Sequence, residues 1–318
     1  MMDIGHTLKF MLFIALGLLS AIFIFWWVRR TREQRARKQL ANESEPSGAP
    51  TPAQLAIGFG TNFLDTLGIG SFATTTAAFK LLRLVRDEYI PGTMIVGHTL
   101  PVIAQAFIFM TVVRIDPVML VLLIIATAIG GWLGAGIVSG LPRRLIQVGM
   151  GIALLLAALS MMMSQFGLFP VGGASLSLST TRLLIALVMS FIFGALLTLG
   201  IGNYAPSLVL FSLLGMDPRA AFPVMMGAGA FTGIVAGIKF LSKRRYDHRA
   251  ALGLMIGGIP GVLLAAFAVK SLSLDAIRWL VMLVIVYTAV TMLRAASAER
   301  HRLDFKGAAC EHNESSHL

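Results

Sequence analysis

Charged residues and cysteine are both scarce in this chain. Only 13% of its 318 residues are Asp, Glu, Lys or Arg, whereas a soluble domain usually carries about 25%. The single cysteine, Cys310, excludes an intramolecular disulfide framework. Hydrophobic residues make up 57% of the chain, and its mean hydropathy is +0.82. These values exclude a disordered chain and a soluble globular enzyme, and they are typical of a polytopic helical membrane protein.

Cofactor motifs are also missing. No Walker-type phosphate loop is present, so we do not expect ATP hydrolysis. The six histidines are scattered and no metal-ligand spacing occurs, so we expect no metal and no other cofactor. The net charge is +11, but the basic residues follow apolar runs, which is typical of membrane loops rather than of nucleic-acid binding.

Nine apolar stretches are long enough to be compared with a membrane-spanning helix, which needs roughly 20 apolar residues. They cover 8–28, 53–79, 91–113, 117–139, 145–164, 183–214, 221–241, 251–270 and 277–293. If all nine crossed fully, the basic runs 80–86 and 143–144 would lie outside, against the positive-inside rule. If 53–79 and 183–214 instead enter and return on the same side, both runs become cytoplasmic. The cytoplasmic basic runs are then 29–38, 80–86, 143–144, 239–249 and 294–306, which hold 20 of the 26 Lys and Arg residues.

Length supports this second arrangement. A continuous helix over 53–79 would be about 40 Å long, which exceeds the hydrocarbon core of about 30 Å. Two limbs of about 12 residues would instead meet near the midplane. We therefore predict an all-α membrane protein with seven full crossings and two re-entrant elements, the N-terminus outside and the C-terminus in the cytoplasm.

A sequence repeat relates the two re-entrant elements. The segment Thr-Leu-Gly-Ile-Gly occurs at 66–70 and again at 198–202, an offset of 132. Pro91 keeps that offset with Pro223, and Gly97 with Gly229; after a slip of one residue, Asp116 matches Asp247. Each copy holds one re-entrant element and three crossings, so the second copy must be inverted. We expect five parts: an extra N-terminal transmembrane helix with a basic linker (1–52), repeat 1 (53–165), an extracytoplasmic linker (166–180), inverted repeat 2 (181–295) and a cytoplasmic tail (296–318).

The glycine-rich tips of the two re-entrant elements form a candidate anion site. Ser71 and Asn203 occupy N-cap positions of the returning half-helices, and Pro206 fits the first turn of the second one. A helix N-terminus presents free N–H groups and a positive dipole end, so two opposed N-termini favour a small anion. The predicted substrate-binding residues are Gly68, Ile69, Gly70, Ser71, Phe72, Thr74, Thr75, Gly200, Ile201, Gly202, Asn203, Tyr204 and Ser207. For Thr74, Thr75 and Thr76, hydrogen bonding to their own helix is the competing interpretation.

Polar and ionisable residues within the apolar stretches are candidates for coupling or gating. They are Asn62, Asp65, His98 and Gln105. Asp65 lies beside the first tip, where it could carry a coupling proton, bind a cation or pair with His98; the alternatives are a helix cap or a bond to Asn62. His98 suits a switch or an anion contact, and a packing histidine is the alternative.

Around these tips the chain resembles the TauE/SafE family of membrane permeases, the sulfite and sulfonate exporter group. The resemblance is carried by 67–70 and 199–202, which both read Leu-Gly-Ile-Gly, and by Ile-Pro-Gly-Thr at 90–93 and Gly-His-Thr-Leu-Pro at 97–101. It covers about 53–295, so that 8–28 and the basic linker look like additions to the core. Where the family pattern commonly continues as a glycine run, this chain has Ser71-Phe72 and Asn203-Tyr204. The resemblance implies secondary transport, with export favoured, of a small organic or sulfur-containing anion such as sulfite or a sulfonate across a bacterial inner membrane.

We expect alternating access, in which the two repeats rock about the paired tips, with the lipid bilayer and a small anion as partners. Proton coupling and a homo-oligomer stay open. One alternative is a channel, or a cation- or proton-linked carrier, centred on Asp65. Another is an intramembrane hydrolase with Ser71 as nucleophile and His98 as base, although the second tip has Asn203 in place of a nucleophile. A scaffold subunit is the third, but the short soluble segments offer little docking surface. We therefore expect a transporter and not an enzyme, with no nucleic acid as partner.

Overall fold

The computed structural model describes residues 4–40, 49–67, 69–112, 115–168, 173–200, 202–217 and 221–268, and parts of 279–298. Two residues of the predicted tips, Gly68 and Ile201, lie outside these ranges. Within the described residues the chain forms helices, joined by loops and one isolated β-bridge between Ser175 and Met216. The predicted all-helical class is therefore confirmed for this part of the chain.

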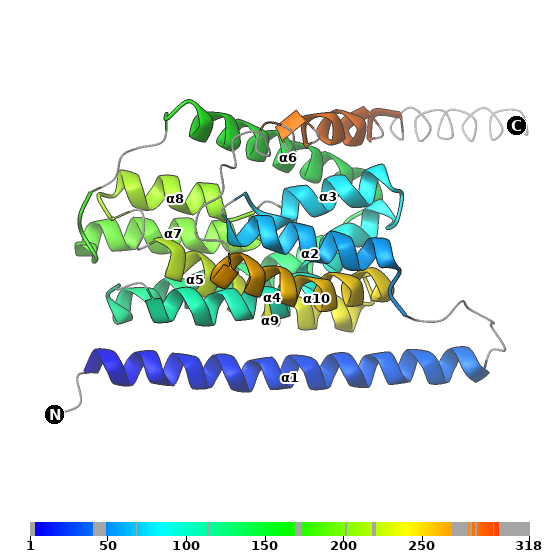
Figure 1. Cartoon of the computed structure of the whole chain (residues 1–318), viewed down its shortest axis with the longest axis horizontal. Coiled ribbons are helices and arrows are strands. Elements are labelled where there is room, and N and C mark those ends of the chain that lie inside the picture. The colour runs from blue at the N-terminus through cyan, green and yellow to red at the C-terminus, as the bar shows by residue number, and fades with distance from the viewer. Residues whose placement is uncertain are drawn as a thin grey trace, which may run out of the picture.

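Figure 1 shows the helices running along one common axis, with α1 on one side of the bundle and α6 on the other. Their bounds are α1 Ile4–Leu40, α2 Pro52–Thr66, α3 Ser71–Leu81, the 3₁₀ turn η1 Asp87–Tyr89, α4 Ile90–Val112, α5 Pro117–Val138, α6 Arg143–Gln165, α7 Thr180–Leu197, α8 Tyr204–Leu213, α9 Ala221–Lys243, α10 His248–Leu263 and the π-turn η3 Leu264–Ala268.

Seven of the described helices are long and apolar enough to cross a membrane. Seven is also the predicted number of full crossings, but the helices that make up the seven are not the same. It includes Thr180–Leu197, which we expected to be one limb of a re-entrant element. It does not include 277–293, of which 277, 278, 280, 281 and 284 lie outside the described residues; a shorter apolar helix, Ile285–Ala298, is found there.

The first broken element consists of α2 and α3. A capping box between Thr51 and Gln54, with Pro52 at the first turn, starts α2. Gly70 has φ +91°, a conformation that favours glycine, and α3 begins at the next residue. In Figure 1, α2 runs from one end of the bundle to its middle and α3 returns to the same end. The limbs have 15 and 11 residues, close to the predicted 12.

The second broken element, α7 and α8, enters from the opposite end (Figure 1). Backbone bonds at that end tie its two outer ends together: the Gly173 N–H donates to the Met216 carbonyl (2.9 Å), and the Asp217 N–H to the Ser175 carbonyl (2.9 Å). The limbs are unequal, with 18 residues in α7 and 10 in α8. The limbs differ in length because the apolar run before the glycines is longer than the run after them.

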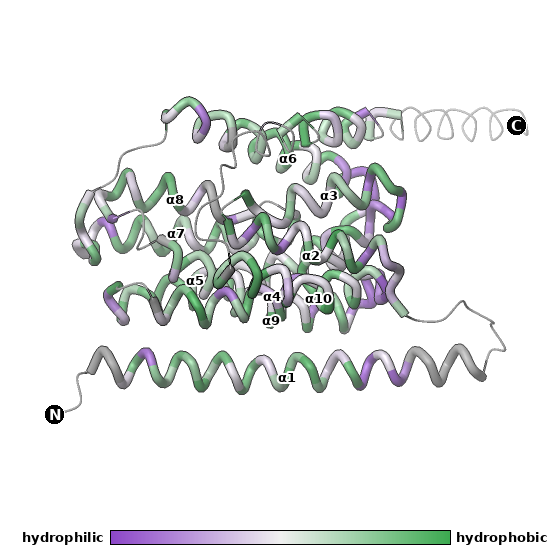
Figure 2. Tube along the Cα trace, viewed as in Figure 1, coloured by the Kyte–Doolittle hydropathy of each residue, from purple (hydrophilic) through white to green (hydrophobic). Residues whose placement is uncertain are grey.

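Basic residues gather at the end from which α2 enters, which we call the basic end; Figure 2 shows the hydrophilic residues there. Four contacts join its segments: Trp27 Nε1 to His248 Nδ1 (3.4 Å), Arg249 Nε to the Ala49 carbonyl (3.1 Å), the Asp247 N–H to Thr93 Oγ1 (2.8 Å), and Arg143 Nη2 to Asp87 Oδ2 (3.1 Å). The described parts of the basic runs 29–38, 80–86, 143–144 and 239–249 therefore share one end of the bundle.

Helix packing follows a matched pattern in the two halves. Helices α4 and α9 pack on each other at the centre, α2 packs on α10, and α7 packs on α5. A Cβ atom at Gly130 would overlap the carbonyl oxygen of Phe191, and one at Gly261 would overlap that of Phe59. Both Cβ–oxygen distances would be below 3.0 Å, a separation that real Cβ atoms essentially never show. Glycine is thus required where these backbones approach most closely.

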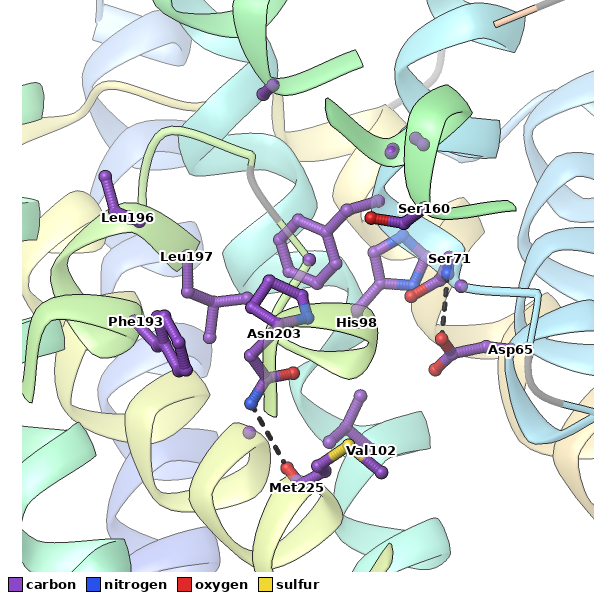
Figure 3. Close-up of a pocket in the computed structure, with 18 of the residues that line it drawn as sticks. Asp65, Ser71, His98, Val102, Ser160, Phe193, Leu196, Leu197, Asn203 and Met225 are labelled. Atoms are coloured by element: carbon purple, nitrogen blue, oxygen red, sulfur yellow. Dashed lines mark hydrogen bonds between the residues drawn. The ribbon is translucent and has the colours of Figure 1, made fainter. Parts of the chain in front are cut away.

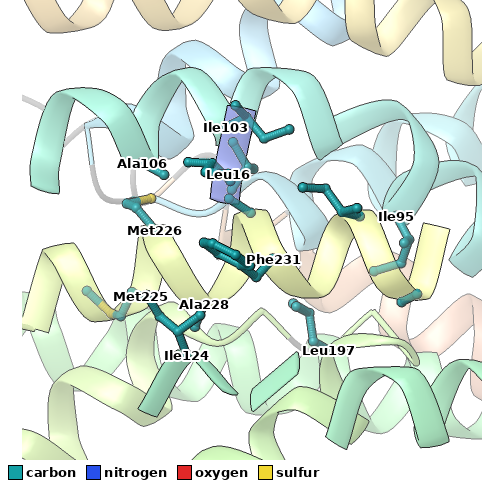
Figure 4. Packing of buried hydrophobic residues seen from close by; sticks show 14 of the residues in the cluster. Leu16, Ile95, Ile103, Ala106, Ile124, Leu197, Met225, Met226, Ala228 and Phe231 are labelled. Carbon is teal, nitrogen blue, oxygen red and sulfur yellow. The ribbon is translucent and has the colours of Figure 1, made fainter. Parts of the chain in front are cut away.

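The apolar core fills the space between α1, α4, α5 and α9 (Figure 4). Leu16 of α1, Ile103 of α4, Ile124 of α5 and Phe231 of α9 are all members of this cluster. Helix α1 packs against α9, α5 and α4, but many of its large apolar side chains remain exposed. In a membrane protein such a surface is expected to face lipid.

Candidate functional site

A cavity of about 370 Å³ lies where the inner ends of the two broken elements meet (Figure 3). Its wall combines residues of both tips with residues of α4, α6, α7 and α9. The lining residues are Asp65, Ile69, Gly70, Ser71, Phe72, Ala73, Ile95, His98, Thr99, Val102, Ala153, Leu156, Ala157, Ser160, Ser164, Phe193, Leu196, Leu197, Gly202, Asn203, Pro206, Leu208, Met225, Met226, Gly229 and Gly233. Such a volume lies within the range of about 300–1,000 Å³ that is usual for small-ligand sites.

The structure brings many of the predicted site residues to this one cavity. Those in its wall are Asp65, Ile69, Gly70, Ser71, Phe72, His98, Gly202 and Asn203. The predicted residues outside the wall are Asn62, Thr74, Thr75, Gln105, Gly200 and Ser207. Gly68 and Ile201 lie outside the described residues, as does the side chain of Tyr204, which opens α8.

The start of α3 differs from the prediction by one residue. Gly70, not Ser71, is the N-cap, because the turn requires the positive φ of glycine. Glycine has no side chain to cap the helix, and Asp65 takes that role: its Oδ1 accepts the Ser71 N–H at 2.8 Å. The helix-cap alternative for Asp65 is therefore the arrangement that the structure contains. Asn203 is the N-cap of α8 as predicted, but its Nδ2 donates to the Met225 carbonyl (3.4 Å) instead of capping the helix.

Asp65 is held by an amide and not by a cation. Its side chain is 9% exposed, and Gln105 Nε2 donates to its Oδ2 at 3.1 Å and to Thr66 Oγ1 at 2.9 Å. Thr66 in turn donates to the Asn62 carbonyl at 2.8 Å. Within the described residues, Asp65 forms neither the ion pair with His98 nor the side-chain bond to Asn62 that we considered.

His98 is fixed on both ring nitrogens. Asn62 Nδ2 donates to the Gly58 carbonyl (2.8 Å), so its Oδ1 faces His98 and accepts from Nδ1 at 3.0 Å. Thr75 Oγ1 lies 2.9 Å from Nε2, and the Phe72 ring lies beside the imidazole at 5.6 Å. The Asn62 contact places a proton on Nδ1, and the Thr75 hydroxyl can donate to a bare Nε2 or accept from a protonated one. Neither nitrogen is left to activate Ser71, which disfavours the Ser71–His98 hydrolase.

The remaining threonines of α3 bond to their own helix. Thr74 donates to the carbonyls of Gly70 (3.0 Å) and Ser71 (2.9 Å), and Thr76 donates to that of Phe72 (2.9 Å). The competing interpretation is therefore correct for Thr74 and Thr76. Thr75 instead reaches His98 and acts on the cavity wall from behind it.

A family model described as "Sulfite exporter TauE/SafE" matches residues 3–161 and 182–315. The chain belongs to the TauE/SafE sulfite exporter family. No curated protein and no solved structure matches. Membership identifies the chain as a membrane transporter, in agreement with its seven long apolar helices. The match begins at residue 3, so it includes α1 and is wider than the 53–295 expected from the motifs alone.

One wall of the TauE/SafE cavity escaped the sequence analysis. Helix α6 contributes Ala153, Leu156, Ala157, Ser160 and Ser164. The two serines are four residues apart and share one face of the helix, which is the signal that could have marked them. Figure 3 shows Ser160 near Ser71 and His98, with Leu196, Leu197 and Phe193 of α7 across the cavity. Polar groups thus cluster on part of the wall and the rest is apolar.

The charges around the cavity set its chemistry. Among the described lining residues none is Lys or Arg, and Asp65 is the one carboxylate. Also within the described residues, no group of three or more His, Cys, Asp or Glu side chains could hold a metal. The donors available to an anion are therefore amides at the starts of α3 and α8 and the side chains of Ser71, Asn203, Ser160 and Ser164.

The cavity extends toward the end opposite the basic end. Along α6 its wall runs from Ala153 to Ser164, about 16 Å at the helical rise, and Ser164 is next to the last residue of the helix. On the basic side, Phe79, Ile90, Met94, Ile146 and Met150 form a buried apolar cluster. The terminal methyl groups of Met94 and Met150 lie 3.1 and 3.4 Å from the Cβ position of Gly200, so this cluster closes the space under the second tip.

Charged groups cover the apolar cluster on the basic side. Asp87 accepts from Lys80 Nζ (2.6 Å), Gln147 Nε2 (2.6 Å) and Arg143 Nη2 (3.1 Å). These bonds join the end of α3 and the turn η1 to the start of α6. The basic end of the bundle is thus closed by an apolar layer beneath a charged one.

Proposed function

We propose that this chain exports sulfite or a small sulfonate as a secondary carrier, and that the anion binds where the tips of the two broken elements meet. The observation that carries the proposal is that two sets of residues, from elements entering at opposite ends, line a single cavity: Ile69 to Ala73 in the first element, and Gly202, Asn203 and Pro206 in the second. A backbone interrupted inside a membrane is tolerated where it lines a cavity, and such paired interruptions mark the binding sites of secondary transporters.

The carrier is built from two inverted repeats, each with a broken element followed by longer helices. Three matched pairs support this. The first is the packing of α2 on α10 and of α7 on α5; the second is the close approach of Gly130 to Phe191 and of Gly261 to Phe59. The third is the pair of N-caps, since Asp116 accepts the Met119 N–H (2.9 Å) and Asp247 the Ala250 N–H (2.8 Å). Inverted halves can exchange conformations, which produces two states that are related by a pseudo-two-fold axis in the membrane plane and open to opposite sides.

The basic end faces the cytoplasm, because basic loops remain on that side. This orientation puts the N-terminus outside and the C-terminus inside a bacterial inner membrane. The cavity in this structure then extends toward the outside, while the apolar layer and the Asp87 cluster close the cytoplasmic side. The transport cycle alternates this state with one in which the layer opens.

The substrate contacts fall on the two helix starts. An oxyanion takes N–H groups of α3 and α8 and the side chains of Ser71 and Asn203, and the apolar remainder of the wall contacts the substrate body. The second candidate is a cation- or proton-linked carrier centred on Asp65, and the observation that favours it is that this carboxylate lies in the cavity wall. A proton-linked anion carrier satisfies both observations.

Sulfite efflux from proteoliposomes tests the proposal. We expect saturable efflux from vesicles that contain the protein, and a weaker substrate affinity for Asn203→Ala by about ten- to a hundredfold, the loss of one hydrogen bond to a charged group. Ser139→Ala is the matched control, because Ser139 lies at the end of α5 outside the cavity and bonds to the Gly136 carbonyl. Absence of sulfite and sulfonate flux in the wild type refutes the proposed function. If Asn203→Ala has the same substrate affinity as the wild type, the anion does not bind at Asn203.

A further inference from the structure

We infer that Asp65 is a built-in competitor of the substrate: its carboxylate holds the start of α3 until it takes up a proton, and the anion then replaces it. This inference deepens the proposed function and rests on it. It assigns one proton to each anion bound, and it assigns Gln105 as the residue that receives the protonated acid.

The first step concerns the amide that both anions need. The Ser71 N–H is at the first residue of the 11-residue helix α3, in the cavity wall, and it donates to Asp65 Oδ1 at 2.8 Å. The N-cap, Gly70, has no side chain that could replace this bond. A substrate oxyanion at the first tip needs the same N–H, and two negative charges at one helix start repel each other. Binding of the anion therefore requires Asp65 to lose its charge and leave.

The second step concerns the place to which the acid goes. Gln105 is fully buried, and while its Nε2 donates to Asp65 Oδ2 and Thr66 Oγ1, its Oε1 is a buried acceptor with no hydrogen-bond partner. An ionised carboxylate has no hydrogen to donate, but a carboxylic acid has one. A protonated Asp65 can donate its O–H to Gln105 Oε1 while still accepting from Nε2. This paired arrangement satisfies the orphan acceptor and releases the Ser71 N–H.

Few other charged groups can supply this pH dependence. His98 on α4 is the other titratable side chain of the described cavity wall, and both its nitrogens are bonded to Asn62 and Thr75. On α3, Lys80 is nine residues from Ser71, about 13 Å along the helix, and is bound to Asp87. On α10 and α6, the groups His248, Arg249, Arg143 and Arg144 all lie in the first turn, at the basic end.

Charge balance follows from the exchange. The empty site carries the Asp65 carboxylate; the loaded site carries a neutral acid and one monovalent anion. The charge within the membrane is the same in both states, so the membrane potential does not favour either. For a monovalent sulfonate the inference thus predicts electroneutral symport of one proton per anion, and net export then requires an outward anion gradient steeper than the inward proton gradient.

Equilibrium binding of methanesulfonate to the purified full-length protein between pH 5 and 9 tests the inference, because this probe keeps one charge over the whole range. Above the pH at which Asp65 ionises, we expect the wild-type dissociation constant to rise about tenfold for each pH unit. Asp65→Asn, whose amide can pair with Gln105 but does not ionise, should bind with no pH dependence. Gln105→Leu removes the acceptor that receives the protonated acid, so its affinity for methanesulfonate at low pH should be weaker than that of the wild type.

Two variants serve as matched controls. Asp116→Asn also replaces a helix-capping acid, but outside the cavity, and Asn is an equally good N-cap. It should keep the tenfold slope, and His98→Gln should keep it whatever its absolute affinity.

The possible failures are distinct. A wild-type dissociation constant that does not change with pH, or an Asp65→Asn that keeps the slope, overturns the inference while the transport function stands. If the dissociation constant of His98→Gln no longer changes with pH, the proton belongs to His98, and this result also overturns the inference about Asp65. If neither methanesulfonate nor sulfite binds or moves in any variant, the proposed function itself fails.

Discussion

Substitution of single glycines at the helix contacts tests the fold most directly. A Cβ atom at Gly130 would overlap the backbone oxygen of Phe191, which belongs to α7 and cannot move without its helix. To bring this approach to the 3.4 Å at which ordinary contact begins, α7 must shift away from α5 by about 1.5 Å, and overpacking of this kind costs about 1–3 kcal/mol. Gly261→Ala should cost a similar amount, because its Cβ would meet the oxygen of Phe59 on α2 in the matching contact.

Gly60 provides the opposite control within the same chain. It lies inside α2, and a Cβ atom at this position meets nothing within 4 Å. Gly60→Ala should therefore leave packing unchanged and gain up to about 1 kcal/mol, since alanine favours the helix over glycine. The comparison separates a steric requirement for glycine from a general preference.

The assay is the midpoint of thermal unfolding of each purified variant in the same detergent. We expect Gly130→Ala and Gly261→Ala to unfold below the wild type and Gly60→Ala at or above it. If Gly130→Ala is as stable as the wild type, the α5–α7 contact is wrong. If Gly60→Ala is destabilised as strongly as Gly130→Ala, glycine acts through backbone conformation and not through helix packing.

Further predictions concern the basic end and the loops. Asp87→Asn should lower stability by about 1–3 kcal/mol, a reduced cost for a broken ion pair because Arg143 is 53% exposed and screened by water; an unchanged unfolding midpoint would contradict the Asp87 cluster. Asp247→Ala removes the α10 cap and should cost about 1 kcal/mol, whereas Asp247→Asn should be nearly neutral in the same assay. Burial raises the pKa of Tyr246 to about 12, so the unfolded chain ionises first and wild-type stability should fall as the pH rises from 10 to 12. Tyr246→Phe removes the ionisable hydroxyl and should therefore lack that part of the pH dependence.

Features that depend on neighbouring residues could be read from the sequence. The apolar runs predicted the helices, since hydrophobicity and length are local properties. The glycine segments at 66–70 and 198–202 marked both helix breaks, because a tight turn needs backbone angles that glycine adopts freely. The offset between Asp116 and Asp247 predicted equivalent positions, and both residues prove to be N-caps.

Features that depend on contacts between residues far apart in the chain could not be predicted from the sequence. Gln105 lies 40 residues from Asp65, and its bond to the carboxylate exists only because α4 packs beside α2. The α6 wall was missed because Ser160 and Ser164 sit in an ordinary apolar helix whose orientation the sequence does not fix.

The amino-acid sequence by itself determined the helical membrane class, the two interrupted helices and their glycine tips, because each follows from the free energy of a short segment in lipid. Only the tertiary structure decided that Gly70 and not Ser71 caps α3, that Asp65 replaces the missing cap, and that both tips open into one cavity. Those outcomes depend on which helices pack together, and packing is a property of the whole chain.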